Sequence, residues 1–174
     1  MHTQASGEVI EWSFTLVCDL NGTDATDVAE RLYGSGCGDV LVSTQFGRLI
    51  LAYDREAGNF AGALCSALRE AWSLGVRVIR IEPETMVTAS EIAARVGVSR
   101  QAVSLAAAGR RGTGFPPPVA RVTTSSPLWD WPTVARWYAG RGAIRTRDVI
   151  VARHIARMNA WIARTGSAPA LQTA

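Results

Sequence analysis

The chain has 174 residues, enough for one ordinary domain or two small ones, and 48% of them are hydrophobic, which is enough to bury a core. No apolar run approaches the ~18 to 20 residues that span a bilayer, and the first residues lack the basic and apolar regions of a secretory signal. The three cysteines fit neither a zinc-binding spacing nor a disulfide framework. We therefore expect a cytoplasmic protein without a membrane segment, metal or other cofactor, and with Cys18 and Cys65 in its core.

The formal net charge of +3 conceals an uneven distribution along the chain. Residues 1–84 contain 6 arginines and 12 acidic residues, a balance of −6, whereas residues 85–174 contain 12 arginines and 3 acidic residues, a balance of +9. Such an asymmetry indicates an acidic module followed by a module that binds a polyanion.

The first half of the sequence alternates strand and helix patterns. Apolar side chains at every second position predict a half-buried strand over residues 9–19, and Asp24 or Thr23 can cap a helix that continues to Tyr33. A hairpin is predicted within residues 39–53, because two apolar runs flank a short glycine-containing break.

An amphipathic helix follows, with apolar side chains at every fourth residue from Phe60 to Trp72, and a fourth strand ends at Pro83. The order βαββαβ predicts a ferredoxin-like domain over residues 1–84, with both helices on one face of an antiparallel sheet. Its role stays open between dimerisation, sensing of a small molecule and docking of a protein.

Enzyme activity and RNA binding are disfavoured for this first module. Its third strand has a single aromatic residue, Tyr53, and the module is acidic, which argues against an RNA-binding sheet. Acylphosphatase-like chemistry would need an anion-binding glycine loop with a paired arginine and asparagine, and the module has none. Its scattered aspartates are explained by helix capping and solvation. We expect no catalytic residues in the chain.

The segment at residues 88–109 carries the clearest functional pattern. Thr88 and Glu91 have the spacing of a capping box at the start of a helix. Ala93 is small enough for a close helix crossing, Gly97 suits the turn that follows, and Val103 anchors a second helix. This spacing predicts a helix-turn-helix, although any two-helix corner needs similar residues.

Polar side chains gather at the start of the second helix and are expected to face outward: Ser99, Arg100, Gln101 and Ser104. Arginine can bond to guanine and glutamine to adenine in the major groove. Arg110 and Arg111 follow the helix, where they can contact phosphates.

A short hairpin and a third helix are predicted next. Residues 119–122 and 128–129 can pair as a small wing, and Asp130 can cap the helix that follows it. With these elements the chain resembles the winged helix-turn-helix proteins of the MerR, AlpA and excisionase superfamily, on the segments EIAARVGVSRQAV, FPPPVARVTTSSPLWDW and VARW. As a whole it also resembles uncharacterised actinobacterial two-domain DNA-binding proteins.

The resemblance implies that residues 85–142 bind double-stranded DNA, with the second helix in the major groove. It also implies wing contacts to the backbone or minor groove from Arg121, Thr123, Thr124 and Ser125. The first module precedes the DNA-binding region, whereas effector regions of MerR regulators follow it, so their effector binding is not transferred. Trp129, Trp131 and Trp137 are expected in the core of the wing and helix.

A long helix is predicted within residues 143–166, followed by a flexible tail at 167–174. Its apolar stripe, Val151, Ile155, Met158 and Ile162, can pack onto the chain's own domains or form a homodimer contact. Together these patterns predict an α+β protein that acts as a dimeric transcriptional regulator. The alternatives are an excisionase-like architectural factor, a DNA-binding antitoxin, and an interaction adaptor that does not bind DNA.

Overall fold

The computed structural model describes residues 9–20, 22 and 24–166, and the predicted tail at 167–174 lies outside them. The chain is of the α+β class, as expected, and divides into two compact units. One unit comprises residues 1–83 together with 158–174, and the other comprises residues 84–157. Each unit is described separately below.

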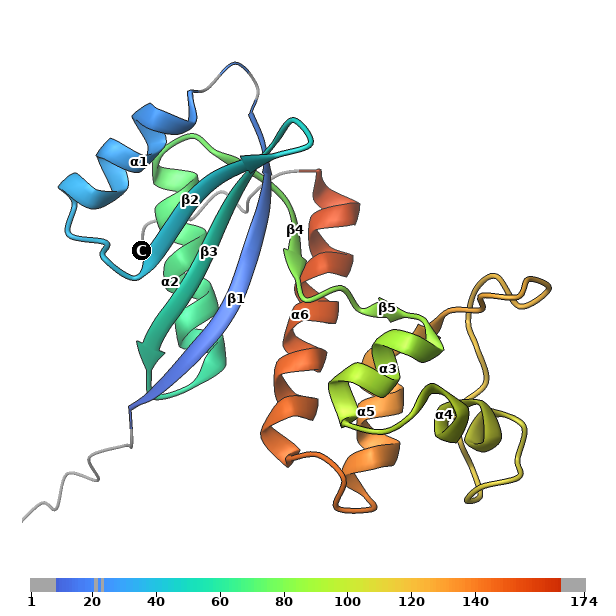
Figure 1. Ribbon diagram of the computed structural model, residues 1–174. Coiled ribbons are helices and arrows are strands. Elements are labelled where there is room, and N and C mark those ends of the chain that lie inside the picture. The colour runs from blue at the N-terminus through green and yellow to red at the C-terminus, as the bar shows by residue number, and fades with distance from the viewer. Residues whose placement is uncertain (1–8, 21, 23, 167–174) are drawn as a thin grey trace, which may run out of the picture. The chain divides into compact units, whose positions relative to one another are not determined.

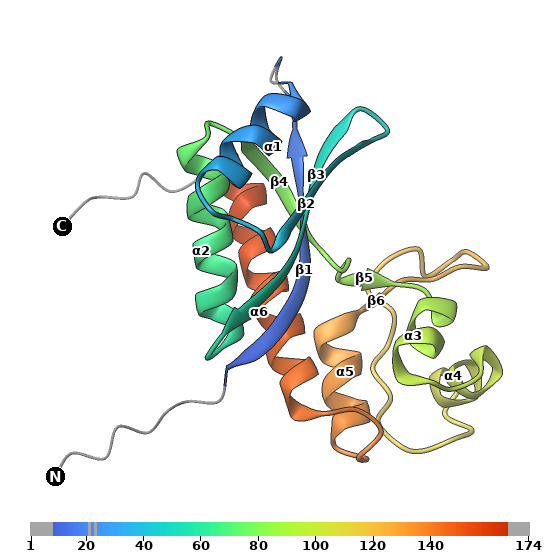
Figure 2. The same cartoon turned by 60° about the vertical axis from the view of Figure 1, so that its left-hand side comes forward.

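The first unit is built on an antiparallel sheet with the strand order β2-β3-β1-β4 (Figure 1). Its elements in chain order are β1 (Ile10–Asp19), α1 (Ala25–Gly34), β2 (Val40–Gln45), β3 (Arg48–Ala57), α2 (Phe60–Ser73) and β4 (Arg77–Glu82). Both helices lie on the same face of this sheet (Figure 2). The predicted succession of strands and helices is confirmed.

Local residues determine where these elements begin and turn. Asp24 caps α1 by accepting a hydrogen bond from the backbone N–H of Thr26 at 2.9 Å, and Asn59 caps α2 in the same way. Between β2 and β3, Phe46 and Gly47 both have positive φ angles, of 49° and 74°. Two such residues match the right-handed twist of a two-residue hairpin, which explains the tight turn.

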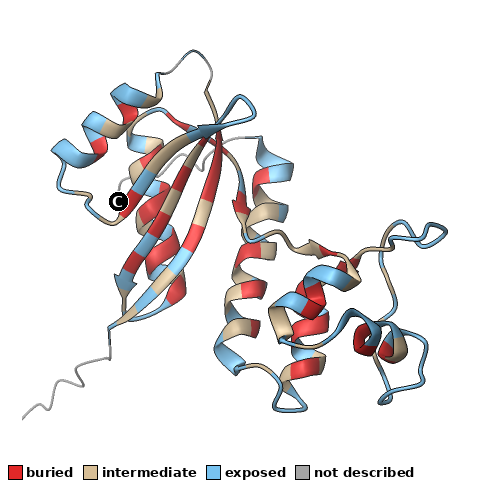
Figure 3. Ribbon diagram, viewed as in Figure 1, coloured by how far each residue is buried: buried red, intermediate tan, exposed pale blue. Residues whose placement is uncertain are grey.

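The core of this unit lies between the sheet and its helices. Every second residue of β3 from Leu49 to Arg55 is buried, and the second half of β1 is also largely buried. Ring contacts join Phe14 of β1 to Tyr53 of β3 and to Phe60 of α2. Figure 3 shows this alternation along the strands. Cys18 is buried, but the prediction for Cys65 was wrong: it is exposed, because α2 buries the stripe of Ala63, Leu64, Ala67 and Leu68 instead.

Arg55 of β3 is a buried charge that the sequence pattern did not reveal. Its side chain is 9% exposed, and its five N–H groups donate to Asp39, Glu70 and Ser66 at 2.6 to 2.9 Å. The guanidinium also lies 4.8 Å from the centroid of the Tyr53 ring. Hydrogen bonding from Arg55 lowers the pKa of Asp39, which keeps this carboxylate charged in the folded state.

The outer edge of β4 is covered at one residue by the last helix, α6 (Thr146–Thr165). The side-chain oxygen of Asn159 accepts a hydrogen bond from the N–H of Ile81 at 2.7 Å, and its amide nitrogen donates to the carbonyl of Ile81 at 2.8 Å. The two bonds replace those of a further strand. Trp161, two residues along the helix, contacts Trp72 of α2 at a centroid distance of 6.4 Å.

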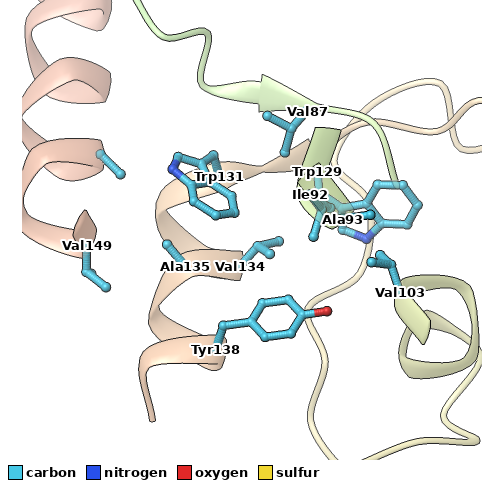
Figure 4. Packing of buried hydrophobic residues seen from close by; sticks show 11 residues of the cluster. Val87, Ile92, Ala93, Val103, Trp129, Trp131, Val134, Ala135, Tyr138 and Val149 are labelled. Carbon is cyan, nitrogen blue, oxygen red and sulfur yellow. The ribbon is translucent and has the colours of Figure 1, made fainter. Parts of the chain in front are cut away.

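The second unit is a helical cluster with a small sheet. It contains β5 (Met86–Val87), α3 (Ala89–Val96), α4 (Arg100–Ala107), β6 (Trp129–Asp130), α5 (Trp131–Ala139) and the part of α6 up to Arg157. Its core joins residues of every one of these elements, and Trp129 and Trp131 are buried in it as expected, whereas Trp137 is only half-buried (Figure 4).

Pairing around Trp129 differs from the prediction. Trp129 lies opposite Val87 in the sheet of β5 and β6, not in the wing hairpin, where the sequence analysis placed it. The hairpin is reduced to one bridge, between Ala120 and Leu128. The reason is that the buried Trp129 ring packs into the core beside β5, a two-residue strand too short to give a periodic pattern.

The apolar stripe of α6 is largely covered within the chain itself. Of the predicted stripe, Ile155 and Ile162 are buried, and Val151 and Met158 are half-buried. Val149 and Ala152 beside it belong to the core of the second unit. Packing within the chain thus accounts for the burial of these residues, and the homodimer contact stays a prediction. Within the described residues, no helix is long and apolar enough to cross a membrane.

Candidate nucleic-acid interface

Helix α3 begins at the predicted capping box. Thr88 accepts a hydrogen bond from the N–H of Glu91 through its hydroxyl at 3.3 Å, and the Glu91 carboxylate accepts from the N–H of Thr88 at 2.6 Å. The N–H and the hydroxyl of Thr88 both donate to the Glu91 carboxylate, and these two bonds lower the pKa of Glu91 because they stabilise its charged form. The start of α3 is thereby fixed without help from the rest of the chain.

The turn from α3 to α4 depends on Gly97. Its φ and ψ angles are 75° and 33°, in the left-handed region, and its N–H donates to the carbonyl of Ala93 at 2.9 Å. Two residues later Ser99 caps α4 by accepting a hydrogen bond from the N–H of Ala102 at 3.1 Å. The turn is thus confined to the residues between Val96 and Arg100, as the sequence predicted.

The inner face of α4 is anchored in the core of the second unit. Ala102, Val103 and Ala106 are buried, and Val103 belongs to the same cluster as Ile92 of α3 and Val134 of α5 (Figure 4). Because these contacts hold one side of the helix against the core, its opposite side is presented to solvent.

That outer face carries the four residues predicted to read DNA, and all of them are exposed: Ser99, Arg100, Gln101 and Ser104. The hydroxyl of Ser99 is engaged as the cap, and that of Ser104 donates to the carbonyl of Arg100 at 3.1 Å. The side chains of Arg100 and Gln101, in contrast, make no hydrogen bond or ion pair with any described residue. Their donors and acceptors are free for an external partner.

Two further arginines follow directly after α4. The N–H groups of Arg110 and Arg111 both donate to the carbonyl of Leu105, at 2.8 and 3.1 Å, so the chain folds back against the end of the helix. Both side chains are exposed, and neither forms an ion pair within the described part of the chain. Their backbone is therefore held while their charges remain available.

The wing segment, which we define as residues 119–128, projects from the second unit (Figure 1). Its tip is a turn in which the N–H and hydroxyl of Thr124 both donate to the carbonyl of Arg121, at 3.0 and 2.9 Å. Arg121 has a φ of 50°, and its side chain is exposed, as are Thr123, Thr124 and Ser125. Val122 at the same tip is 63% exposed.

Two arginines of the second unit are engaged with aromatic rings. The guanidinium of Arg95 lies 5.0 Å from the centroid of Trp131 and donates to the carbonyl of Glu84, and burial lowers its pKa. Arg141 lies 3.6 Å from the centroid of Trp137 and donates to the carbonyl of Thr113 at 2.7 Å. Neither pair was predicted from the sequence, although Trp137 and Arg141 have the i, i+4 spacing of helix neighbours.

The second unit therefore presents its ten predicted contact residues on two parts of its surface: α4 with the residues directly after it, and the tip of the wing segment. No group of three His, Cys, Asp or Glu side chains that could hold a metal ion occurs in the described ranges. No family model, no curated protein and no solved structure matches this chain. We therefore infer a function from the chemistry of these surfaces.

Proposed function

We propose that this chain binds double-stranded DNA, with α4 in the major groove and the wing segment beside it on the backbone or in the minor groove. The observation that carries the proposal is the division of α4 into two faces. Its buried face is locked into the core, and its exposed face offers Arg100 and Gln101 with unpaired polar groups. These two side-chain types are those that read guanine and adenine.

Charge supports the same proposal. Residues 85–174 have a balance of +9, and Arg110, Arg111 and Arg121 are exposed around the reading helix. Arginines in such positions neutralise phosphates and release counterions from the duplex, which supplies much of the affinity of a DNA-binding protein. Cytoplasmic action follows from this proposal, because the target is DNA.

We further propose a winged helix-turn-helix arrangement for residues 85–142 and a ferredoxin-like arrangement for the first unit. The strand order β2-β3-β1-β4 supports the latter, and the three helices with the wing segment support the former. A single helix-turn-helix reads few base pairs, so we propose that the protein acts as a homodimer on two half-sites, as a transcriptional regulator. In this proposal the first unit either forms the homodimer or binds a protein or small molecule that regulates DNA binding.

The proposal is tested by selecting binding sites for the full chain from random duplexes and measuring affinity at several salt concentrations. A DNA-binding protein enriches a motif with two half-sites about one helical turn apart, and its affinity falls steeply with salt. An interaction adaptor would enrich no motif and show no salt-dependent affinity. Enrichment of a motif with a single half-site would contradict the homodimer but not DNA binding.

Replacement of Arg100 by alanine sharpens this test. We expect affinity for the selected site to fall by about 1–3 kcal/mol and the preference at one base pair to relax. Arg136→Ala is the matched control, since Arg136 is exposed on α5 and its loss removes the same charge. If both variants lose the same small amount on every sequence, α4 does not read bases.

A further inference from the structure

A cavity of about 270 Å³ lies behind the reading helix, between α4, the residues that follow it and α5. Its apolar surface comes from Val98, Ala102 and Ala106 on one side and from the rings of Trp137 and Tyr138 on the other. Small side chains line it where α4 faces it, which is why space remains there. Ligand pockets typically have this character, an apolar lining with a few polar groups.

The polar groups of this cavity are hydrogen-bond donors. Arg111 and Arg141 both line it, and Arg141 is held over the Trp137 ring at 3.6 Å. The Tyr138 hydroxyl makes no hydrogen bond with a described residue, and Figure 4 shows it pointing away from α5, on the side where Val103 of α4 lies. Burial raises the pKa of Tyr138 while Arg111 counteracts this, so the phenol stays protonated and can donate.

The cavity is also maintained by a glycine. Gly112 has a φ of 73°, and a Cβ added there would come within 3.1 Å of the Trp137 ring. Glycine therefore allows the chain after α4 to approach Trp137 closely and to place Arg111 at the cavity. None of the described residues that line the cavity is acidic, whereas two are arginines, so its charge is positive.

We propose that this cavity binds a small aromatic carboxylate. The ring lies between the α4 alanines and the aromatic side chains of α5, and the carboxylate accepts hydrogen bonds from Arg111 and the Tyr138 hydroxyl, with Arg141 adding charge. A carboxylate suits these donors, since arginine forms strong charge-assisted hydrogen bonds with carboxylates. The ligand contacts the buried face of α4, whose opposite face carries Arg100 and Gln101.

A consequence for DNA binding rests on the proposed function. A ligand that contacts both α4 and α5, and that binds one orientation of the reading helix more tightly than another, shifts the population towards that orientation and so changes the affinity for DNA. By linkage, DNA changes the affinity for the ligand by the same factor.

The test uses the full chain without DNA and four probes: benzoate, naphthalene-2-carboxylate and the two corresponding carboxamides. Binding is followed by NMR at the indole N–H of Trp137 and the amides of Ala102 and Ala106. We expect saturable shifts with at least one carboxylate and none with its carboxamide. No saturable shift with either carboxylate up to roughly 10 mM, or equal binding of the carboxamide, overturns the proposal.

Matched variants assign the donors. Arg111→Gln is expected to weaken carboxylate binding by roughly 10- to 100-fold and Tyr138→Phe by roughly 2- to 10-fold. Arg110→Gln is the control, because Arg110 is the exposed neighbour that does not line the cavity. Equal losses in Arg110→Gln and Arg111→Gln overturn the proposal. Since the probes are measured without DNA, failure of this site and failure of DNA binding are separate results.

Discussion

We expect Arg55→Met to lower the free energy of unfolding in the natural chain. In a variant that lacks the carboxylate partners of Arg55, we expect the same substitution to raise it. In the natural chain the guanidinium is nearly buried and donates all five of its N–H groups to Asp39, Glu70 and Ser66. Methionine loses these bonds, but the two carboxylates are 31% and 28% exposed and regain hydration. We therefore expect a loss of about 3 kcal/mol, the lower end for breaking a buried pair.

The double variant Asp39→Ala/Glu70→Ala reverses the situation. Arg55 then keeps its buried position with the Ser66 hydroxyl and the Tyr53 ring as neighbours but without either carboxylate, which leaves an uncompensated charge inside the first unit. In this background, methionine removes the cost of burying that charge. We expect Arg55→Met to raise the free energy of unfolding there by about 1–3 kcal/mol.

Amide hydrogen exchange of β3, supported by urea unfolding, measures the effect in the first unit specifically. Arg48→Met is the matched control, because the Arg48 side chain is 48% exposed and pairs with Asp19 at the surface. Its effect should stay within about 0.5 kcal/mol in both backgrounds. If Arg55→Met lowers the free energy of unfolding by the same amount in both backgrounds, the two carboxylates do not compensate a buried charge and the reasoning fails.

Two other substitutions test features of the separate units. Asn159→Ala removes the two hydrogen bonds to the N–H and carbonyl of Ile81 at the edge of β4. The free energy of unfolding, measured in urea, should therefore fall by about 2–4 kcal/mol. Arg164→Ala, on the exposed side of α6, is the control and should change it little. Arg121→Ala should lower DNA affinity equally for all sequences and reduce the slope of log affinity against log salt by about 1, while an unchanged slope would remove the wing segment from the interface.

Features encoded by neighbouring residues could be predicted from the sequence. The capping box at Thr88 and Glu91, the turn at Gly97 and the cap at Ser99 each involve residues no more than four positions apart. Their chemistry is complete within one helical turn, so tertiary packing has little to alter. The exposed positions of Arg100 and Gln101 follow from the same periodicity.

Features encoded by distant residues could not be predicted in this way. Asn159 and Ile81 are separated by 78 positions, and an asparagine in a helix shows no preference for a particular strand edge. Arg55 continues the inward alternation of β3, but a charged side chain at that position gives no sign of its partners on other elements. The pairing of Trp129 with Val87 involves strands of two residues each, shorter than any detectable period.

Helix α6 completes the first unit from the far end of the chain, and this has a consequence for synthesis on the ribosome. The first 83 residues emerge early, but Asn159 and Trp161 are translated only after the whole second unit. Until then the outer edge of β4 offers its N–H and carbonyl groups at Ile81 to any other extended chain. A translation product that stops before Met158 would retain this open strand and be prone to aggregate.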